Sequence, residues 1–172
     1  PTTFNPSQAT ILPQYDPVHD VMISIKGTQA NLYNYHSNVS KSVAIPTNSS
    51  QTDYATTVDT RRGQFYFIMS SGLYKIDPDS GKCTRVADAG PGFPTSLHDE
   101  NMLGLNVISY DEANDLILYV YDGVNPKQSL PTNSETWVFK CDSLVWHKVI
   151  PIASPPDRGH LAYNRNLNLF MM

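Results

Sequence analysis

The hairpin Asn106-Val107-Ile108-Ser109-Tyr110-Asp111, which turns into Asp115-Leu116-Ile117-Leu118-Tyr119-Val120, decides the fold of this chain. A short strand runs into an acidic residue, a tight turn follows, and a strongly apolar strand returns. The same shape recurs at 11–25, 54–69 and 160–172. The turn residues of the four copies are Asp16, Asp59, Asp111 and Asn164, which lie 43 to 53 residues apart. A period of this size, with several short strands per unit, is typical of a β-propeller.

Two further strands follow each of the first three hairpins, so each unit has the pattern of a four-stranded antiparallel meander. In the second unit the last two strands are joined by Asp77-Pro78-Asp79-Ser80-Gly81, a sequence that favours a tight turn. We therefore predict an all-β fold, a β-propeller of four-stranded antiparallel blades with about three and a half blades present. The expected blades are 9–45, 53–88, 105–150 and a partial blade at 160–172, after an N-terminal linker or extension at 1–8.

The composition agrees with sheets rather than helices. Apolar residues make up 40% of the chain and charged residues 16%, below the roughly 25% usual for soluble domains. Tyr, Asn, Ser, Thr and Pro fill the difference, and no stretch carries the apolar stripe of an amphipathic helix. The aromatic residues on the expected strands, such as Phe65, Tyr119, Trp137 and Trp146, are therefore expected to pack between blades.

The stretch 135–172 resembles the junction of two kelch repeats, as found in the central domain of galactose oxidase. Thr136-Trp137-Val138-Phe139 resembles the third kelch strand, and Trp146 lies where the fourth strand carries an aromatic residue. Pro155-Pro156-Asp157-Arg158-Gly159-His160 resembles the lead into a first strand, and Leu169-Phe170-Met171 resembles the second strand. The resemblance implies a propeller fold and carries no particular activity with it.

Three and a half blades cannot close a ring, and an open propeller leaves strand edges unpaired, which proteins normally avoid. Three explanations are open: further blades beyond one or both ends, pairing with other chains, or closure by a rearranged N-terminal segment. We expect a segment of a longer propeller. The chain also opens on Pro1 rather than Met, which is expected of a processed or excised segment.

Loop lengths indicate where a binding site would lie. The turns between first and second strands, and between third and fourth strands, are short, whereas 46–52, 87–104, 122–134 and 151–159 are long and belong to the opposite end of the blades. Loops on a rigid scaffold commonly carry recognition. The expected ligand-binding residues are Phe93, His98, Asp99, Glu100, Asp122, Asn125, Arg158 and His160. Aromatic, amide and carboxylate groups together suit a glycan, although such loops also occur simply as solvated loops, and His160 also suits a structural role.

No catalytic motif is recognised, because His98-Asp99-Glu100 lacks the spacing of a zinc site and no phosphate loop or nucleophile elbow occurs. We predict a binding or structural module with a glycan or protein ligand and no cofactor. Two alternatives remain open. One is part of a propeller enzyme acting on polysaccharide, of the lyase or oxidase type, with His160, Arg158 and Tyr54 near the centre. The other is an assembly subunit that pairs its open edges with other chains.

The charge balance argues against a nucleic-acid partner, since the net charge is −4, the pI is about 5.6 and basic residues do not cluster. No apolar run reaches the roughly 18 residues of a membrane span.

Two sequons, Asn38-Val39-Ser40 and Asn48-Ser49-Ser50, lie in polar, turn-like stretches and predict glycosylation at Asn38 and Asn48. They favour an extracellular or secretory location. The spacing of Cys83 and Cys141 fits no metal knuckle or redox pair, which leaves free thiols or one bridge between neighbouring blades.

Overall fold

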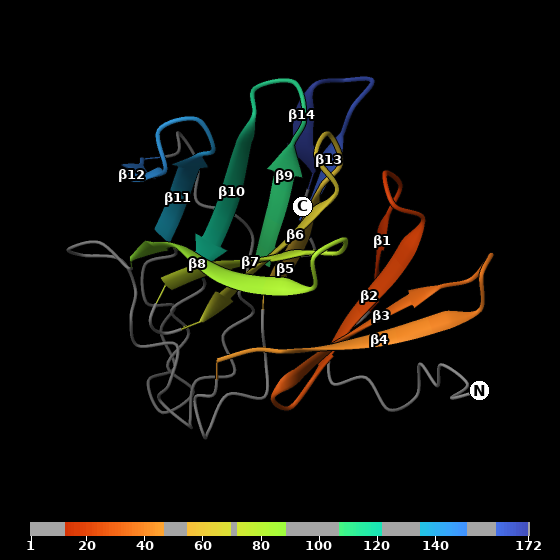
Figure 1. Cartoon of the computed structure of the whole chain (residues 1–172). Helices are drawn as coiled ribbons and strands as arrows, with labels where there is room; N and C mark the ends of the chain where they lie inside the picture. The colour runs from red at the N-terminus through yellow and green to blue at the C-terminus, as the bar shows by residue number, and fades with distance from the viewer. Residues whose placement is uncertain are drawn as a thin grey trace, which may run out of the picture. The chain divides into compact units, whose positions relative to one another are not determined.

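The structure, a computed structural model, describes residues 13–46, 55–69, 72–88, 107–121, 135–150 and 161–171. The regular elements of these residues are all β-strands (Figure 1). The chain divides into two compact units, Pro1–Val86 and Ala87–Met172.

The first unit holds two four-stranded antiparallel sheets, and in each sheet every strand lies beside the next one in sequence. Blade 1 consists of β1 (Gln14–Asp16), β2 (Val21–Lys26), β3 (Gln29–Asn34) and β4 (Val39–Ala44). Blade 2 consists of β5 (Thr56–Asp59), β6 (Gln64–Met69), β7 (Gly72–Asp77) and β8 (Lys82–Asp88). The first strands of the two blades, β1 and β5, lie against each other.

The second unit repeats this arrangement with one complete sheet and one hairpin. Blade 3 consists of β9 (Val107–Asp111), β10 (Leu116–Tyr121), β11 (Glu135–Lys140) and β12 (Val145–Val149). The hairpin consists of β13 (Ala162–Asn164) and β14 (Leu169–Met171), and its first strand lies against β9. The predicted all-β fold of four-stranded antiparallel sheets is therefore confirmed.

One four-residue turn joins the third and fourth strands of blade 1. Tyr35 begins this turn, and β4 begins at Val39 directly after it. Asn38 takes a positive φ of 54°, closes a four-residue loop and places Val39 opposite Asn34.

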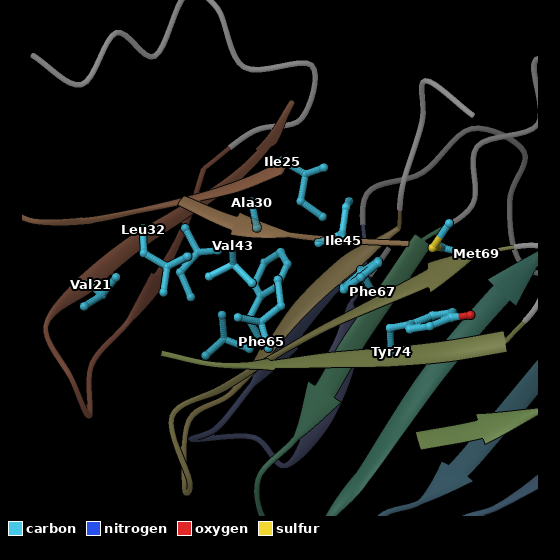
Figure 2. Close-up of a cluster of buried hydrophobic side chains, with 13 residues drawn as sticks. Val21, Ile25, Ala30, Leu32, Val43, Ile45, Phe65, Phe67, Met69 and Tyr74 are labelled. Atoms are coloured by element: carbon cyan, nitrogen blue, oxygen red, sulfur yellow. The ribbon is translucent and has the colours of Figure 1, made fainter. Parts of the chain in front are cut away.

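The core of the first unit lies between blades 1 and 2 (Figure 2). Blade 1 contributes mainly aliphatic side chains, namely Val21, Ile23, Ile25, Leu32 and Val43. Blade 2 contributes mainly larger ones, namely Phe65, Phe67, Met69, Tyr74 and Ile76. Because a shift of one residue would turn each of these strands inside out, this core fixes their register. Truncating the fully buried Phe67 to alanine would cost about 3–5 kcal/mol.

Aromatic packing also dominates one side of blade 3. Ile117, Tyr119 and Phe139 are fully buried, and Trp137 nearly so. The ring of Trp146 lies 5.1 Å from that of Phe139 and 6.2 Å from that of Tyr119, measured between centroids. The strand aromatics therefore serve packing, as the sequence predicted.

Candidate functional site at the rims of the blades

The hairpin ends of the blades are formed by four-residue turns of a single type. Each turn closes with a residue at positive φ, a conformation that Gly, Asn and Asp adopt most readily. The closing residues are Asp20, Asn38, Gly63, Gly81, Asp115, Leu144 and Asn168, with φ between 50° and 64°. The N–H of Gly63 donates to the carbonyl of Asp59 at 2.8 Å, and the N–H of Gly81 to that of Asp77 at 2.9 Å. The turns between first and second strands and the outer turns, between third and fourth strands, thus share one backbone geometry.

A buried acid anchors the first turn of each complete blade. Asp16, Asp59 and Asp111 are all buried, and in each of them Oδ1 accepts the backbone N–H two residues further on at 2.9 Å. In the hairpin β13–β14 the amide oxygen of Asn164 accepts the N–H of Leu167 at 3.1 Å. Burying a carboxylate without partners would be very costly, so these bonds are what make the position tolerable.

The second carboxylate oxygen is held by a side chain three residues later, and that side chain changes from blade to blade. It is His19 at 2.6 Å in blade 1, Arg62 at 2.7 Å in blade 2 and Asn114 at 2.7 Å in blade 3. Both cationic and neutral donors occur at this position, because the requirement is a hydrogen bond to a buried acceptor.

Burial alone would raise the pKa of Asp111. The hydrogen bonds from the side chain and the N–H of Asn114 are the largest contributions that outweigh burial and hold the pKa below its usual value. Asp111 is therefore a charged structural acceptor and not a poised general acid.

A tyrosine hydroxyl locks three of the first turns. Tyr15 donates to Asp20 at 2.8 Å, and Tyr110 donates to Asp115 at 2.9 Å. Tyr163 donates to Asn168 at 2.6 Å in the same way. In blade 1 Nε2 of His36 also lies 2.8 Å from Oδ2 of Asp20, which gives a Tyr–Asp–His arrangement similar to catalytic machinery. Since the Tyr–acid contact recurs in turns without the histidine, its role is structural.

Neighbouring blades of the first unit are joined across these turns. His19 reaches from blade 1 to Asp79 on the outer turn of blade 2, with Nε2 to Oδ2 at 3.3 Å. Lys41 donates to the carbonyl of Asp79 at 3.1 Å. A side chain at Gly63 would place its Cβ 2.3 Å from Nδ1 of His19, so this close approach requires glycine.

The second unit uses different residues for the same purpose. Arg165 of the β13–β14 turn pairs with Glu112 of the blade 3 turn at 3.2 Å. The hydroxyl of Tyr163 also interacts with the carboxylate of Asp111. The four-residue turns lie together at one end of each blade, which we call the turn rim. The polar side chains described above close these turns or join neighbouring blades.

The opposite rim is where the sequence placed the binding site. Within each blade, the ends of β4, β8, β10 and β12 that lead into the long segments lie opposite the four-residue turns, because each meander reverses direction at every strand. The predicted ligand-binding residues Phe93, His98, Asp99, Glu100, Asp122, Asn125, Arg158 and His160 lie outside the described residues, as does Tyr54.

One polar group at this rim was missed by the sequence reasoning. The carboxylate of Glu135, at the start of β11, accepts from Trp137 Nε1 at 3.0 Å and pairs with Lys148 of β12. The Lys148 ammonium lies 5.7 Å from the centroid of the Trp137 ring, within cation–π range. The sequence could have predicted this ion pair, because Glu135 begins one strand and Lys148 lies near the end of the antiparallel strand that follows it. Ile150, just beyond β12, is almost fully exposed.

The remaining candidate positions are resolved in part. Cys83 and Cys141 are free thiols, which answers the question of a bridge between them. Asn38 is exposed and accepts from the hydroxyl of Tyr33 at 3.2 Å, whereas Asn48 lies outside the described residues. Within the described ranges no three His, Cys, Asp or Glu side chains gather as metal ligands. The same residues contain no helix with the length and apolar character needed to cross a bilayer.

Comparison with known proteins identifies the fold of the chain and does not identify an activity. No model of a protein family and no curated protein sequence matches the chain significantly. Among solved structures, an ancestral GH74 enzyme matches 90% of this chain and 22% of its own length, with a TM-score of 0.60 and 15% identity. The fold is a β-propeller of four-stranded blades.

Two further structures match more loosely. The tricorn protease matches 85% of this chain and 13% of its own length, with a TM-score of 0.48 and 12% identity. Regucalcin from Agrobacterium tumefaciens, described as a calcium-binding protein, matches 79% and 41%, with a TM-score of 0.44 and 15% identity. The chain thus spans less than half the length of each of these three structures.

Proposed function

We propose that this chain is a binding or structural module built from propeller blades, which recognises a protein or glycan ligand at the long-loop rim. The observation that carries the proposal is the contrast between the two rims. Every described turn at the hairpin rim has the same closed geometry, with polar groups committed to the turn or to the next blade. The long polar segments, which differ from one another in length and sequence, leave from the other end of the blades. Such loops on a rigid scaffold commonly carry binding residues.

The repeats are proposed to be of the kelch type. Support comes from Trp146, which lies in β12, the fourth strand of blade 3. Its ring packs on those of Phe139 in β11 and Tyr119 in β10. The Trp137 of the third strand is buried in the same layer.

The ligand proposal is tested on a panel of immobilised glycans and with the purified chain. We expect Phe93→Ala and His98→Ala to weaken binding of a retained glycan by tenfold or more, because few contacts dominate a recognition site. The matched control is Asp142→Ala, an exposed residue of the turn rim, which should change the apparent Kd by less than twofold. Equal binding by all three variants would contradict the loop-rim site.

The same panel separates the module from a polysaccharide enzyme. A binding module leaves the glycan intact, as judged by mass spectrometry of the recovered ligand. Cleavage or oxidation that is lost in a folded His160→Ala variant would instead establish the enzyme.

We further propose that the protein is extracellular and glycosylated. Asn38 supports this, because it is exposed on an outer turn where an attached glycan would not disturb the strands. Expression through a eukaryotic secretory pathway should give a glycosidase-sensitive mass increase that is reduced in Asn38→Gln and in Asn48→Gln. An unchanged mass in the secreted wild-type chain would overturn this part of the proposal.

A further inference from the structure

The outer turn of blade 1 presents the sequon Asn38-Val39-Ser40 in a fixed arrangement. Asn38 closes the turn at a φ of 54°, and β4 begins at the next residue. Ser40 lies directly opposite Tyr33 across the β3–β4 pair. Since directly opposite residues of an antiparallel pair project from the same face, Tyr33 and Ser40 share a face of the sheet. The amide of Asn38 reaches this face as well, because its Oδ1 lies 3.2 Å from the Tyr33 hydroxyl.

The two ends of the Asn38 amide have different surroundings. Oδ1 accepts a hydrogen bond from the Tyr33 hydroxyl. Nδ2, the atom to which an N-linked glycan is attached, has no hydrogen-bond partner among the residues that the structure describes. In the first turn of the same blade, by contrast, Asp20 accepts from a tyrosine with one oxygen and contacts His36 with the other. The Asn38 amide is therefore held at its oxygen and open at its nitrogen.

The turn that carries Asn38 is itself held in place. The side-chain oxygen of Asn34, directly before the turn, accepts from the N–H and from the hydroxyl of Ser37, each at 2.9 Å. Nδ2 of Asn34 donates to the carbonyl of His19 in the first turn at 3.3 Å. All of these contacts lie within blade 1, so the position of the Asn38 amide does not depend on any other part of the chain.

A glycan on Asn38 would leave from the edge of a sheet. Asn38 and Ser40 are exposed, and β4 is an edge strand of blade 1. The next side chain, that of Lys41, projects from the opposite face and reaches the carbonyl of Asp79 in blade 2. The closing residue of the outer turn is accessible in blade 3 as well, where Leu144 is half exposed. Accessibility is therefore a property of the outer turn and not of the place of blade 1 in the chain.

We propose that Tyr33 holds the amide of a glycosylated Asn38 and so fixes the direction in which the glycan leaves the blade. The inference rests on the glycosylation proposed above. Attachment of N-acetylglucosamine replaces one hydrogen of Nδ2 and leaves Oδ1 unchanged, so the hydrogen bond from Tyr33 persists in the modified chain. Because this bond restrains the side-chain torsion of Asn38, the first sugar takes one orientation at the turn rim. Tyr33 is thus a positioning residue for the glycan.

The same hydrogen bond should protect the linkage from hydrolysis. A peptide N-glycosidase breaks the Cγ–Nδ2 bond of a glycosylated asparagine with water. The hydroxyl of the water joins Cγ, a proton goes to the leaving nitrogen, and an aspartate remains in the chain. Negative charge gathers on Oδ1 during this attack and has to be stabilised by donors of the enzyme. In the closed turn Tyr33 occupies Oδ1 of Asn38, so we expect slow release of the glycan from the folded chain.

The test is the rate at which a peptide N-glycosidase releases the glycan from the secreted chain, followed by mass spectrometry. The parent chain carries Asn48→Gln, so that Asn38 is its single sequon. We expect Tyr33→Phe to release the glycan about fivefold faster than the parent, which is the factor that one typical hydrogen bond contributes. Tyr110→Phe is the matched control, because it removes the same kind of contact, to Asp115 in blade 3, and should leave the rate unchanged.

The tryptic glycopeptide 27–41 gives the rate of release without the fold. All three chains should lose the glycan from this peptide at one rate, which is faster than release from the folded parent. Far-UV circular dichroism and the urea midpoint show that each variant is folded. Equal rates for the folded parent and Tyr33→Phe, or an equal rise in Tyr110→Phe, would overturn the role of Tyr33 and leave the glycosylation intact. A secreted parent without a glycan on Asn38 would remove the modification and this inference with it.

Discussion

Nε2 of His19 lies 3.3 Å from Oδ2 of Asp79, while Nδ1 of the same ring lies 2.6 Å from Oδ2 of Asp16. One imidazole therefore joins the buried acid of its own turn to an acid on the neighbouring blade. Burial of the ring opposes its charging. The hydrogen bond to Asp16 and the charges of Asp16, Asp79 and Asp77 outweigh burial, so the pKa of His19 is raised above its usual value.

This raised pKa predicts a pH-dependent junction. The unfolded histidine titrates near pH 6.5, so the stabilisation from the charged ring is complete below about pH 6.5 and is lost as the pH rises through the folded-state pKa. The difference in free energy of unfolding between the wild type and His19→Gln should be largest near pH 5.5 and should shrink by pH 9. Urea unfolding at both pH values measures it. A difference that stays constant with pH would rule out the charged clamp.

Removing the buried acid of blade 2 should be costly. Asp59→Ala leaves the N–H groups of Arg61 and Arg62 without their acceptor, and we expect a loss of about 2–3 kcal/mol. Asp59→Asn should lose clearly less, since an amide oxygen fills this role in Asn164. Urea unfolding measures the loss of unfolding free energy in each variant from the shift of its midpoint, provided that the m value is unchanged. Equal losses for the two variants would show that the carboxylate acts through its charge rather than by closing the turn.

Leu144 occupies a closing position at φ 58°, where a branched, bulky side chain is unfavourable. Its side chain is half exposed, so little packing is lost when it is removed. Leu144→Gly should therefore stabilise the chain by about 1 kcal/mol, and Leu144→Asn by somewhat less.

The matched opposite of this change is Gly63→Ala. It introduces a Cβ at the same kind of φ and within 2.8 Å of the Val18 Cβ, so it should lower the midpoint of thermal unfolding. If Leu144→Gly lowered the midpoint as well, the closing position would not be strained.

Cys83 should react slowly in the folded chain. Burial raises the pKa of its thiol to about 11, so almost none of it is thiolate at pH 8. In a Cys141→Ser variant, where Cys83 is the single cysteine, the rate of reaction with a disulfide reagent should rise steeply between pH 9 and pH 11. In urea the rate at pH 8 should become that of an ordinary thiol. Identical rates at pH 8 with and without urea would contradict this.

Much of the fold could be predicted because its determinants are local. The recurrence of Asp16, Asp59, Asp111 and Asn164 marked each first turn, and the apolar strands that follow marked the sheets. The exact turn ends were less predictable, because a residue such as Leu144 at positive φ has no sequence signature. The donor to the buried acid also escaped detection, since His19, Arg62 and Asn114 share a hydrogen bond and not a residue type.

The site was harder for a different reason. The proposed binding at the loop rim requires separate segments to converge, and no spacing among Phe93, His98 and Arg158 encodes such convergence. In three of the four first turns a tyrosine stands five residues before the closing residue, and this spacing was visible in the sequence and was not used. At Tyr163 the hydroxyl also reaches Asp111 of the neighbouring blade, a contact that the sequence spacing does not reveal.

In every blade each strand lies beside the strand that follows it in the sequence, and each turn closes through its own hydrogen bonds. Contacts within a blade therefore need only short loops to be closed, and short loops cost little chain entropy. A blade can take shape soon after its residues leave the ribosome, before the next blade has been made. We expect the burial of one blade's aliphatic side against its successor to follow later, and nascent chains to be most prone to aggregate before it happens.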